Sequence, residues 1–284
     1  MTRPAHASSA LGATDMDAQS LHPDAQNRTP SFCTVTELPG TEVTRDQLRR
    51  LYNRYRFAAS FCGGKDVLEL ACGAGTGLGY LAHSAKSVVG GDIDPEILAI
   101  AKRHYGDRVK LLQLDAQQLP CPDASFDVLV LFEAIYYLPA PARFAEEARR
   151  VLRPGGVLLV CTANKDLPDF NPSPFAHQYF GPAEFAALLQ PLGFKVECLG
   201  QDPVDLTSVR QRILRTIKRT AVAMGLIPKT MSGKKLLKRL FFGKLAPMPP
   251  EVYDGMAPPA PPVPIPLNAP DTSHRVIHCV ARLS

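Results

Sequence analysis

A carboxylate and a run of alternate glycines stand together in the stretch DVLELACGAGTGLGYLA, residues 66–82. An apolar run leads to Glu69, and Gly73, Gly75 and Gly77 follow in a G-x-G-x-G pattern. A glycine-rich turn between a strand and a helix lets the backbone approach a ligand, and the N-terminus of the helix favours polar oxygens or negative charge. The spacing therefore predicts a nucleotide-type binding loop, which the glycines alone do not specify further.

The carboxylate of Glu69 narrows the kind of ligand. A pyrophosphate would be repelled by it, whereas a ligand with an ammonium and a sulfonium group would be attracted. S-adenosylmethionine carries both groups and no phosphate. Asp92 ends the run VVGGD and can accept from both ribose hydroxyls, as in dinucleotide sites. Asp115 ends LLQLD, where its carboxylate can either accept from an adenine amino group or cap a turn.

The surrounding elements alternate between two types. Apolar, β-rich runs occur at 66–71, 87–92, 109–114, 126–132 and 157–162, and helix-like stretches lie near 77–85, 95–105 and 142–152. A capping box, Thr44-x-x-Gln47, predicts an earlier helix that extends to about residue 61. A helix near 182–191 and strands at 194–199 and 274–283 follow. This alternation predicts an α/β fold with a doubly wound, mainly parallel sheet.

Four segments, in this order and at ordinary spacing, resemble class I S-adenosylmethionine-dependent methyltransferases of the small bacterial type. They are ELACGAGTG (69–77), GGDIDPEIL (90–98), LDAQQLPCPDASFDVLVLFEAIYYL (114–138) and RVLRPGGVLLV (150–160). The resemblance implies a seven-stranded, Rossmann-like sheet whose core spans residues 44–200 and whose final strand lies at 274–284. That last strand would be antiparallel, and a long insertion, residues 205–270, would replace the hairpin turn before it.

The resemblance also implies site residues. Glu69, Gly73 and Gly75 would line the methionine part of the cofactor, Asp92 would hold the ribose, and Phe132 and Glu133 would face the methyl group and the acceptor. The full set implied to bind S-adenosylmethionine is Glu69, Ala71, Gly73, Gly75, Asp92, Ile93, Asp115, Ala116 and Phe132. Ile93 would lie against the adenine, and Asp115 and Ala116 would meet its edge. As an alternative, Phe132 is simply a core residue.

The catalytic residues are less well defined by the sequence. Methyl transfer from a sulfonium needs alignment and exclusion of water, and only a hydroxyl acceptor needs a general base. The candidates are Glu133, His177 and Tyr137, with Tyr136 beside them. No metal is expected, because the seven cysteines are scattered without metal-ligand spacing.

Other residues are expected to enclose the site. The first helix carries Tyr52, Tyr55 and Arg56, which we expect to close over the cofactor, as in similar enzymes. The stretch Asn171–Phe175 predicts a loop near the acceptor pocket, to which Asn164 or Tyr179 would also contribute.

Three segments depart from this pattern. Residues 1–30 lack apolar periodicity and are expected to be disordered. From 205 to 245 there are eleven Lys or Arg and one acid, in a helical pattern that is either a solvated lid or a weak contact with an anionic membrane surface; nucleic-acid binding is less favoured. Residues 246–270 hold ten prolines and are expected to be extended and not packed.

The sequence thus favours a cytoplasmic enzyme that transfers a methyl group from S-adenosylmethionine to a small molecule such as a sugar, a lipid-linked sugar or a secondary metabolite. The overall charge of +5 and the absence of a long apolar run agree with a soluble chain. Two alternatives remain. One is an inactive methyltransferase-fold protein that binds partners through its insertion; the other is a nicotinamide oxidoreductase that uses a later glycine register.

Overall fold

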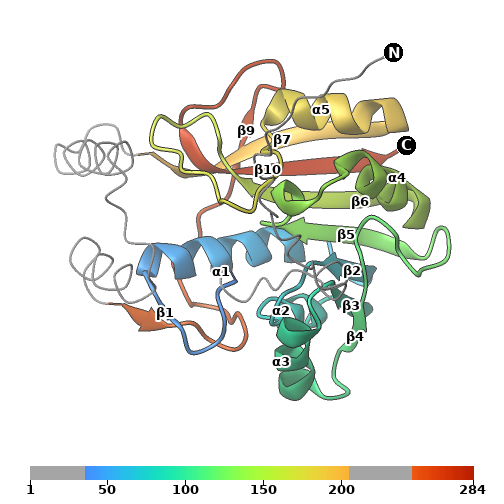
Figure 1. Ribbon diagram of the computed structural model, residues 1–284, viewed down its shortest axis with the longest axis vertical. Helices are drawn as coiled ribbons and strands as arrows, with labels where there is room; N and C mark the ends of the chain where they lie inside the picture. Colours follow the sequence, from blue (N-terminus) through green and yellow to red (C-terminus); the bar gives the residue numbers. More distant parts are fainter. Residues whose placement is uncertain (1–35, 205–244) are drawn as a thin grey trace, which may run out of the picture. The chain divides into compact units, whose positions relative to one another are not determined.

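The computed structural model describes residues 36–204 and 245–284, and its centre is one mixed β-sheet (Figure 1). The strand order is β4-β3-β2-β5-β6-β10-β7-β9. The strands are β2 (Asp66–Leu70), β3 (Ser87–Asp92), β4 (Lys110–Gln113), β5 (Phe126–Phe132), β6 (Leu152–Ala163), β7 (Phe194–Pro203), β9 (Val263–Ile265) and β10 (His274–Leu283). The seven expected strands are all present, and the short strand β9 adds an eighth at the edge.

The sheet is parallel from β4 to β6 and antiparallel beyond. Strand β10 pairs antiparallel with both β6 and β7, which confirms the expected antiparallel last strand. The chain runs outward from β2 to β4 on one side and then returns to β5 on the other. In such sheets ligands bind where the strand order reverses, at the carboxyl ends of the strands. Here that point lies between β2 and β5.

Helices cover both faces of the sheet. They are α1 (Arg45–Ala59), α2 (Leu78–Ala82), α3 (Pro95–Tyr105), α4 (Pro141–Val151) and α5 (Pro182–Leu189), with short 3₁₀ turns η2 (Ile135–Tyr137) and η3 (Gln190–Leu192). Helices α1 to α3 share one apolar cluster, and α4 and α5 share the other. Successive residues of β5 alternate between them: Val128 and Val130 face α1, whereas Leu129 and Leu131 face α4.

Local sequence signals set the helix ends. The expected capping box is present at α1, because Thr44 Oγ1 accepts from Gln47 N at 3.2 Å and Thr44 N donates to Gln47 Oε1 at 2.9 Å. The helix ends at Ala59, two residues earlier than expected, and a turn fills the gap to β2. Asp94 is the N-cap of α3: its side chain accepts from the amides of Glu96 and Ile97, and Pro95 occupies the first turn.

The proline-rich segment is extended only in part, because it turns at Asp254–Gly255 and again near residue 267, and the prediction that it does not pack is wrong. Strand β8 (Ala246–Pro247) pairs antiparallel with β1 (Glu42–Val43), and β9 pairs antiparallel with β7. Met248 and Val252 are buried, with 3% and 2% of their surface exposed. Proline cannot donate a ladder hydrogen bond, so pairing is limited to short edge strands, while the apolar residues between the prolines still find cover.

Two predictions lie outside the described residues: the disorder of residues 1–30 and the basic helical character of 205–244. Within the described ranges, no helix combines the length and the hydropathy that crossing a bilayer requires.

Candidate active site

The glycine loop joins β2 to α2 and follows an unusual backbone path. Ala71, Gly73 and Gly75 all have positive φ, at 52°, 58° and 80°. Gly75 also packs closely, because a Cβ there would lie 2.8 Å from the ring of Tyr105. The Tyr105 hydroxyl donates to Gly75 O at 2.7 Å and accepts from Gly79 N at 2.9 Å. These contacts hold one side of the loop against α3, and the other side faces the carboxyl edge of the sheet.

Glu69 is a buried acid on β2, with 2% of its surface exposed. Its Oε1 accepts a hydrogen bond from the hydroxyl of Tyr55, at 2.5 Å, and its Oε2 has no hydrogen-bond partner among the described residues. Burial raises the pKa of Glu69 to about 7, although Tyr55 and the charge of Arg54 oppose the rise. A buried carboxylate oxygen without a partner indicates that this side chain awaits a donor.

Asp92 ends β3, and its carboxylate links the glycine loop to the turn before α3. Its Oδ2 accepts from Gly73 N at 2.8 Å and its Oδ1 accepts from Asp94 N at 2.9 Å. Burial raises the pKa of Asp92, against the effect of these hydrogen bonds. Each carboxylate oxygen has two lone pairs, so both can accept one more hydrogen bond. The next residue, Ile93, is 36% exposed, which is high for a large apolar side chain that follows a buried strand.

Asp115 and Ala116 follow β4. Asp115 Oδ1 accepts from Gln117 N at 2.9 Å and from Gln117 Nε2 at 3.2 Å, so the turn cap named as the alternative is present. Ala116 is buried beside it. The turn cap does not test whether Asp115 and Ala116 contact the adenine, so that contact stays a prediction.

Phe132 and Glu133 stand at the end of β5, beside the point where the strand order reverses. The buried ring of Phe132 meets the ring of Tyr55 edge to face at 5.5 Å. Glu133 has a φ of 52°, an uncommon conformation for a residue other than glycine. Its Oε1 accepts from Arg54 at 2.8 Å and its Oε2 accepts from the hydroxyl of Tyr136 at 3.0 Å. Both of its oxygens therefore face groups that orient them.

Helix α1 contributes more to this site than the sequence indicated. Tyr55 bonds Glu69, and its ring lies against Gly77, where a Cβ would be 1.8 Å from a ring carbon. Arg54 reaches Glu133, whereas Arg56 is exposed, so the expectation for Arg56 is wrong. The buried stripe of the helix runs through Tyr52 and Tyr55, and residues 54 and 56 flank it on opposite sides. Only the three-dimensional structure shows which flank faces the sheet.

The other candidate bases lie near Glu133 but are held by different partners. The hydroxyl of Tyr137 contacts Ser173 Oγ at 3.3 Å. The side chain of His177 is exposed, and its backbone amide donates to Tyr136 O at 2.7 Å.

The loops after β5 and β6 do meet, in an aromatic group. Tyr136 stacks on Tyr179 with ring centroids 4.6 Å apart, and Tyr137 and Phe170 lie edge-on to this pair. Asn164, which the sequence offered as a pocket residue, has a structural role instead. Its amide donates to the carbonyls of Asp271 and His274, at 2.6 and 2.7 Å.

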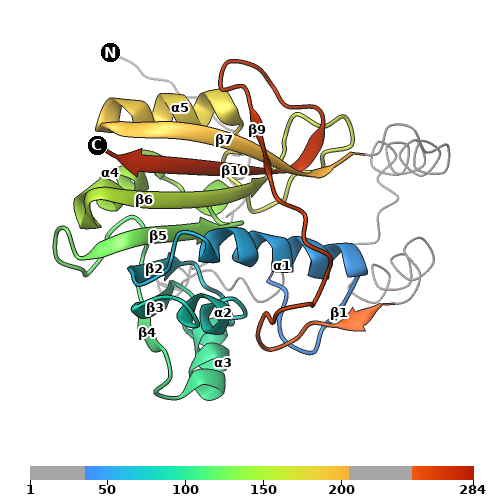
Figure 2. The ribbon, with the colours of Figure 1, turned by 180° about the vertical axis from the view of Figure 1, so that it is seen from behind.

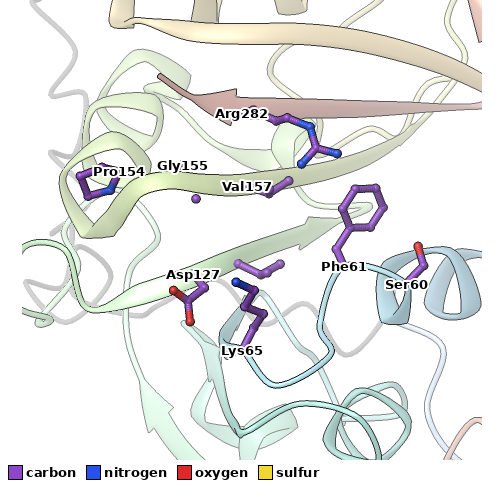
Figure 3. Close-up of a pocket in the computed structure, with 10 residues that line it drawn as sticks. Ser60, Phe61, Lys65, Asp127, Pro154, Gly155, Val157 and Arg282 are labelled. Carbon is purple, nitrogen blue, oxygen red and sulfur yellow. The ribbon is translucent and has the colours of Figure 1, made fainter.

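A cavity of about 390 Å³ opens near the amino ends of the parallel strands, opposite the carboxyl edge (Figure 3). Its lining includes Phe61, Lys65, Asp127 and Arg282, which come from the amino end of β5, the α1–β2 turn and the end of β10. Because ligands of doubly wound sheets bind at the carboxyl ends of the parallel strands, this cavity is not the site built by Glu69 and Asp92.

The comparisons with known proteins agree with this fold and site. The methyltransferase-domain family model matches residues 68–160. A protein of Mycolicibacterium smegmatis named a probable S-adenosylmethionine-dependent methyltransferase is 38% identical over 183 residues, which cover 61% of this chain and 70% of that protein. A fatty-acid O-methyltransferase of the same organism is 38% identical over 112 residues, or 38% of this chain and 41% of that protein.

The structural comparison supports the same fold. A possible histamine N-methyltransferase from Thermotoga maritima, also titled a SAM-dependent methyltransferase, aligns with a TM-score of 0.55 at 15% identity. The alignment covers 84% of this chain and 92% of that one. A Rossmann-like sheet with a glycine loop and acids at its carboxyl edge defines a nucleotide-type binding protein. The chain belongs to the S-adenosylmethionine-dependent methyltransferases, and S-adenosylmethionine is the cofactor that this family implies.

Proposed function

We propose that this chain transfers the methyl group of S-adenosylmethionine to a small-molecule acceptor that binds against the aromatic group after β5 and β6. The observation that carries this proposal is the position of Glu133. It lies at the carboxyl end of β5, between Arg54 on the cofactor side and Tyr136 on the aromatic side. An acceptor beside Tyr136 would therefore be close to the loop that holds the cofactor.

The residues of the glycine loop fit the cofactor. Glu69 Oε2 is a buried acceptor to which none of the described residues donates, which suits an ammonium group. Asp92 retains lone pairs for ribose hydroxyls, and the exposed Ile93 next to it offers an apolar surface to an adenine ring. The positive φ values of Ala71, Gly73 and Gly75 give the tight loop through which a ligand can approach the backbone, and Asp115 and Ala116 would complete the adenine pocket.

When bound, S-adenosylmethionine supplies a methyl group already activated on a sulfonium. The tasks left to the chain are alignment of the acceptor and exclusion of water. Phe132 and Tyr55 form an apolar wall between Glu69 and Glu133, and Arg54 lies over the Phe132 ring at 5.9 Å. For a hydroxyl acceptor, Glu133 Oε2 would take the proton, with Tyr136 holding that oxygen in place.

The acceptor class follows from what surrounds Glu133. Tyr137 and Tyr179 are partly exposed and offer aromatic surface over the buried ring of Tyr136, which suits a sugar or an acceptor with an apolar part, and Phe175 lies exposed in the adjoining loop. The name of the fatty-acid O-methyltransferase relative supports an acceptor with a lipid part. A carboxylate acceptor is already ionised at neutral pH and would need no base from the protein.

A panel assay with the variant Glu133→Gln tests this proposal. Hydroxyl acceptors should lose about 100-fold in kcat, whereas carboxylate acceptors should lose little, because only the former need proton removal. Binding of S-adenosylhomocysteine, measured by calorimetry, should be nearly unchanged in the variant. If the unsubstituted chain binds S-adenosylhomocysteine but turns over no acceptor in the panel, the protein is a binding protein and the enzymatic proposal fails.

A further inference from the structure

A proline-rich strap, defined as residues 246–265, crosses the outer side of the cofactor site. It begins at β8, which pairs with β1, and ends at β9, which pairs with β7. Figure 2 shows this strap in orange to red, running past α1 to the β7 edge of the sheet. Between its two paired ends it makes specific polar contacts with the elements that build the cofactor site.

The first group of contacts lies at the glycine loop and the two helices that follow it. Val252 N donates to Thr76 O at 2.8 Å, and Thr76 is part of the loop itself. The carboxylate of Glu251 accepts from His104 on α3 at 2.6 Å and from Arg108 in the turn after that helix. The carboxylate also lies directly over α2, because a Cβ at Gly79 would be 1.9 Å from Glu251 Oε2. The strap therefore fixes the loop from its outer side.

The charge of Glu251 is suited to this position. Burial alone would raise the pKa of Glu251, but the hydrogen bonds from Arg108 and His104 outweigh that effect and leave the pKa lowered. Glu251 is therefore ionised at neutral pH, and its contacts with α3 are charge-assisted.

The second group of contacts lies on α1. Asn53 is 4% exposed, and its side-chain amide binds the strap at two backbone groups. Nδ2 donates to Pro258 O at 3.1 Å, and Oδ1 accepts from Ala260 N at 2.6 Å. Prolines surround Ala260, so its amide is one of the few donors in this part of the strap. Asn53 lies one position from Arg54 and two from Tyr55, the residues that reach Glu133 and Glu69.

We propose that Asn53 and Glu251 are positioning residues for the cofactor, which act through the strap to hold α1 and the glycine loop at a fixed separation. Their common effect is to keep the hydroxyl of Tyr55 on Glu69 Oε1. Between these two places the strap makes a short turn at Asp254 and Gly255, closed by Met256 N, which donates to Tyr253 O at 3.3 Å. The hydroxyl of Tyr80 on α2 donates to Asp254 at 2.7 Å and holds this turn, so fixing the strap at both places sets the distance between them. This inference rests on the proposed roles of Glu69 and Glu133 in cofactor and acceptor binding.

The physical consequence can be measured through Glu69. The hydrogen bond from Tyr55 lowers the pKa of Glu69, against burial, which raises it. If the Asn53 contacts are removed, α1 can move away and that hydrogen bond weakens. The pKa of Glu69 then rises, and the pH at which an ammonium-bearing ligand loses its carboxylate partner rises with it.

The test is calorimetry of S-adenosylhomocysteine binding to the full chain from about pH 5.5 to 8, a range that spans the titration of Glu69. The variants are Asn53→Ala and Glu251→Ala. Asp123→Asn is the matched control, because Asp123 is an exposed carboxylate that pairs with Arg150 away from the strap. Both strap variants should weaken binding at pH 7 by about tenfold. They should also move the midpoint of the pH dependence upward, whereas the control should match the unsubstituted chain.

A midpoint that stays unchanged in both strap variants would overturn the inference, even if their melting temperatures fall. Hydrogen–deuterium exchange on the free chain gives a readout that needs no ligand. Exchange should accelerate in residues 45–59 and 73–79 of the strap variants, and acceleration confined to 246–265 would again overturn it. If the unsubstituted chain binds no S-adenosylhomocysteine at any pH, the site assignment fails, while the exchange data still decide whether the strap holds α1.

Discussion

The buried carboxylate of Glu69 should make the stability of the free protein depend on pH. Burial raises the pKa of Glu69 from 4.5 to about 7 in the folded chain. A raised pKa means that the folded state binds the proton more tightly than the unfolded state does. The contribution of Glu69 to the free energy of unfolding should therefore be most favourable below pH 4.5 and should be lost as the pH rises through about 7.

The size of the effect follows from the shift. At 1.36 kcal/mol per pKa unit, a shift of this order corresponds to about 3 kcal/mol of stability lost between acid and mildly alkaline pH. No discount for solvent screening applies, because only 2% of the Glu69 surface is exposed. In the variant Glu69→Gln this loss should be absent, and the amide oxygen can still accept the hydrogen bond from Tyr55.

Urea unfolding of both proteins at about pH 5 and pH 8 measures the effect. The difference in the free energy of unfolding between variant and unsubstituted chain should move by about 2.5 kcal/mol in favour of the variant, because the unfolded carboxylate is already largely ionised at pH 5. Any constant cost of burying the glutamine amide is the same at both pH values and cancels. Saturating S-adenosylhomocysteine should remove the pH dependence from the unsubstituted chain, because its ammonium group pairs with the carboxylate.

An equal stability difference at both pH values would refute this reasoning, since it would mean that Glu69 titrates at its ordinary pKa. The exposed carboxylate Asp123, changed to Asn, gives the background expected from a surface charge. A pH dependence that persists with ligand bound would show that the ammonium group lies elsewhere, and would remove Glu69 from the cofactor site.

Four further outcomes are expected. Asp92→Ala should abolish binding of S-adenosylhomocysteine in calorimetry, and unchanged affinity would rule out the ribose contact. Tyr55→Phe should weaken that binding at pH 7 by about fivefold and move its pH midpoint upward, because Glu69 loses its donor. Gly77→Ala should cost about 1–3 kcal/mol in thermal unfolding, since its Cβ would displace the ring of Tyr55, and a stable variant would contradict that contact. The basic segment 205–245 should make the chain sediment weakly with anionic vesicles, and less at high salt. Equal sedimentation with neutral vesicles would contradict this prediction.

The sheet and its helices could be predicted closely because their signals are local. The bounds predicted for β3, β5 and α3 equal those observed, since apolar periodicity changes sharply at each end of these elements. Strand β6 begins five residues earlier than the predicted 157, because the turn at Gly155 stays within the strand as a bulge beside β5. A bulge depends on pairing with a neighbour, which no local pattern contains.

The residues of the candidate site at the carboxyl ends of the strands could also be predicted to lie together. Asp92 and Phe132 end parallel strands and Glu69 is the last residue but one of β2, and the carboxyl ends of such strands meet at one edge of the sheet. A residue at a strand end can therefore be assigned to this edge before its neighbours are known. The contacts that orient it are a different matter: the bond from Arg54 to Glu133 and the bond from Tyr55 to Glu69 both depend on how α1 is rotated.

The rotation of α1 is in turn set by contacts between distant parts of the chain. Asn53 meets Pro258 and Ala260 across more than 200 positions, in a segment whose composition indicates only an extended chain. The same prolines that remove backbone donors leave Ala260 N as a partly buried donor that needs an acceptor. A buried asparagine on a helix is a suitable partner, because its amide offers a donor and an acceptor together. A proline-rich segment can thus fix the angle of the helix that carries Arg54 and Tyr55, provided that one amide side chain faces it.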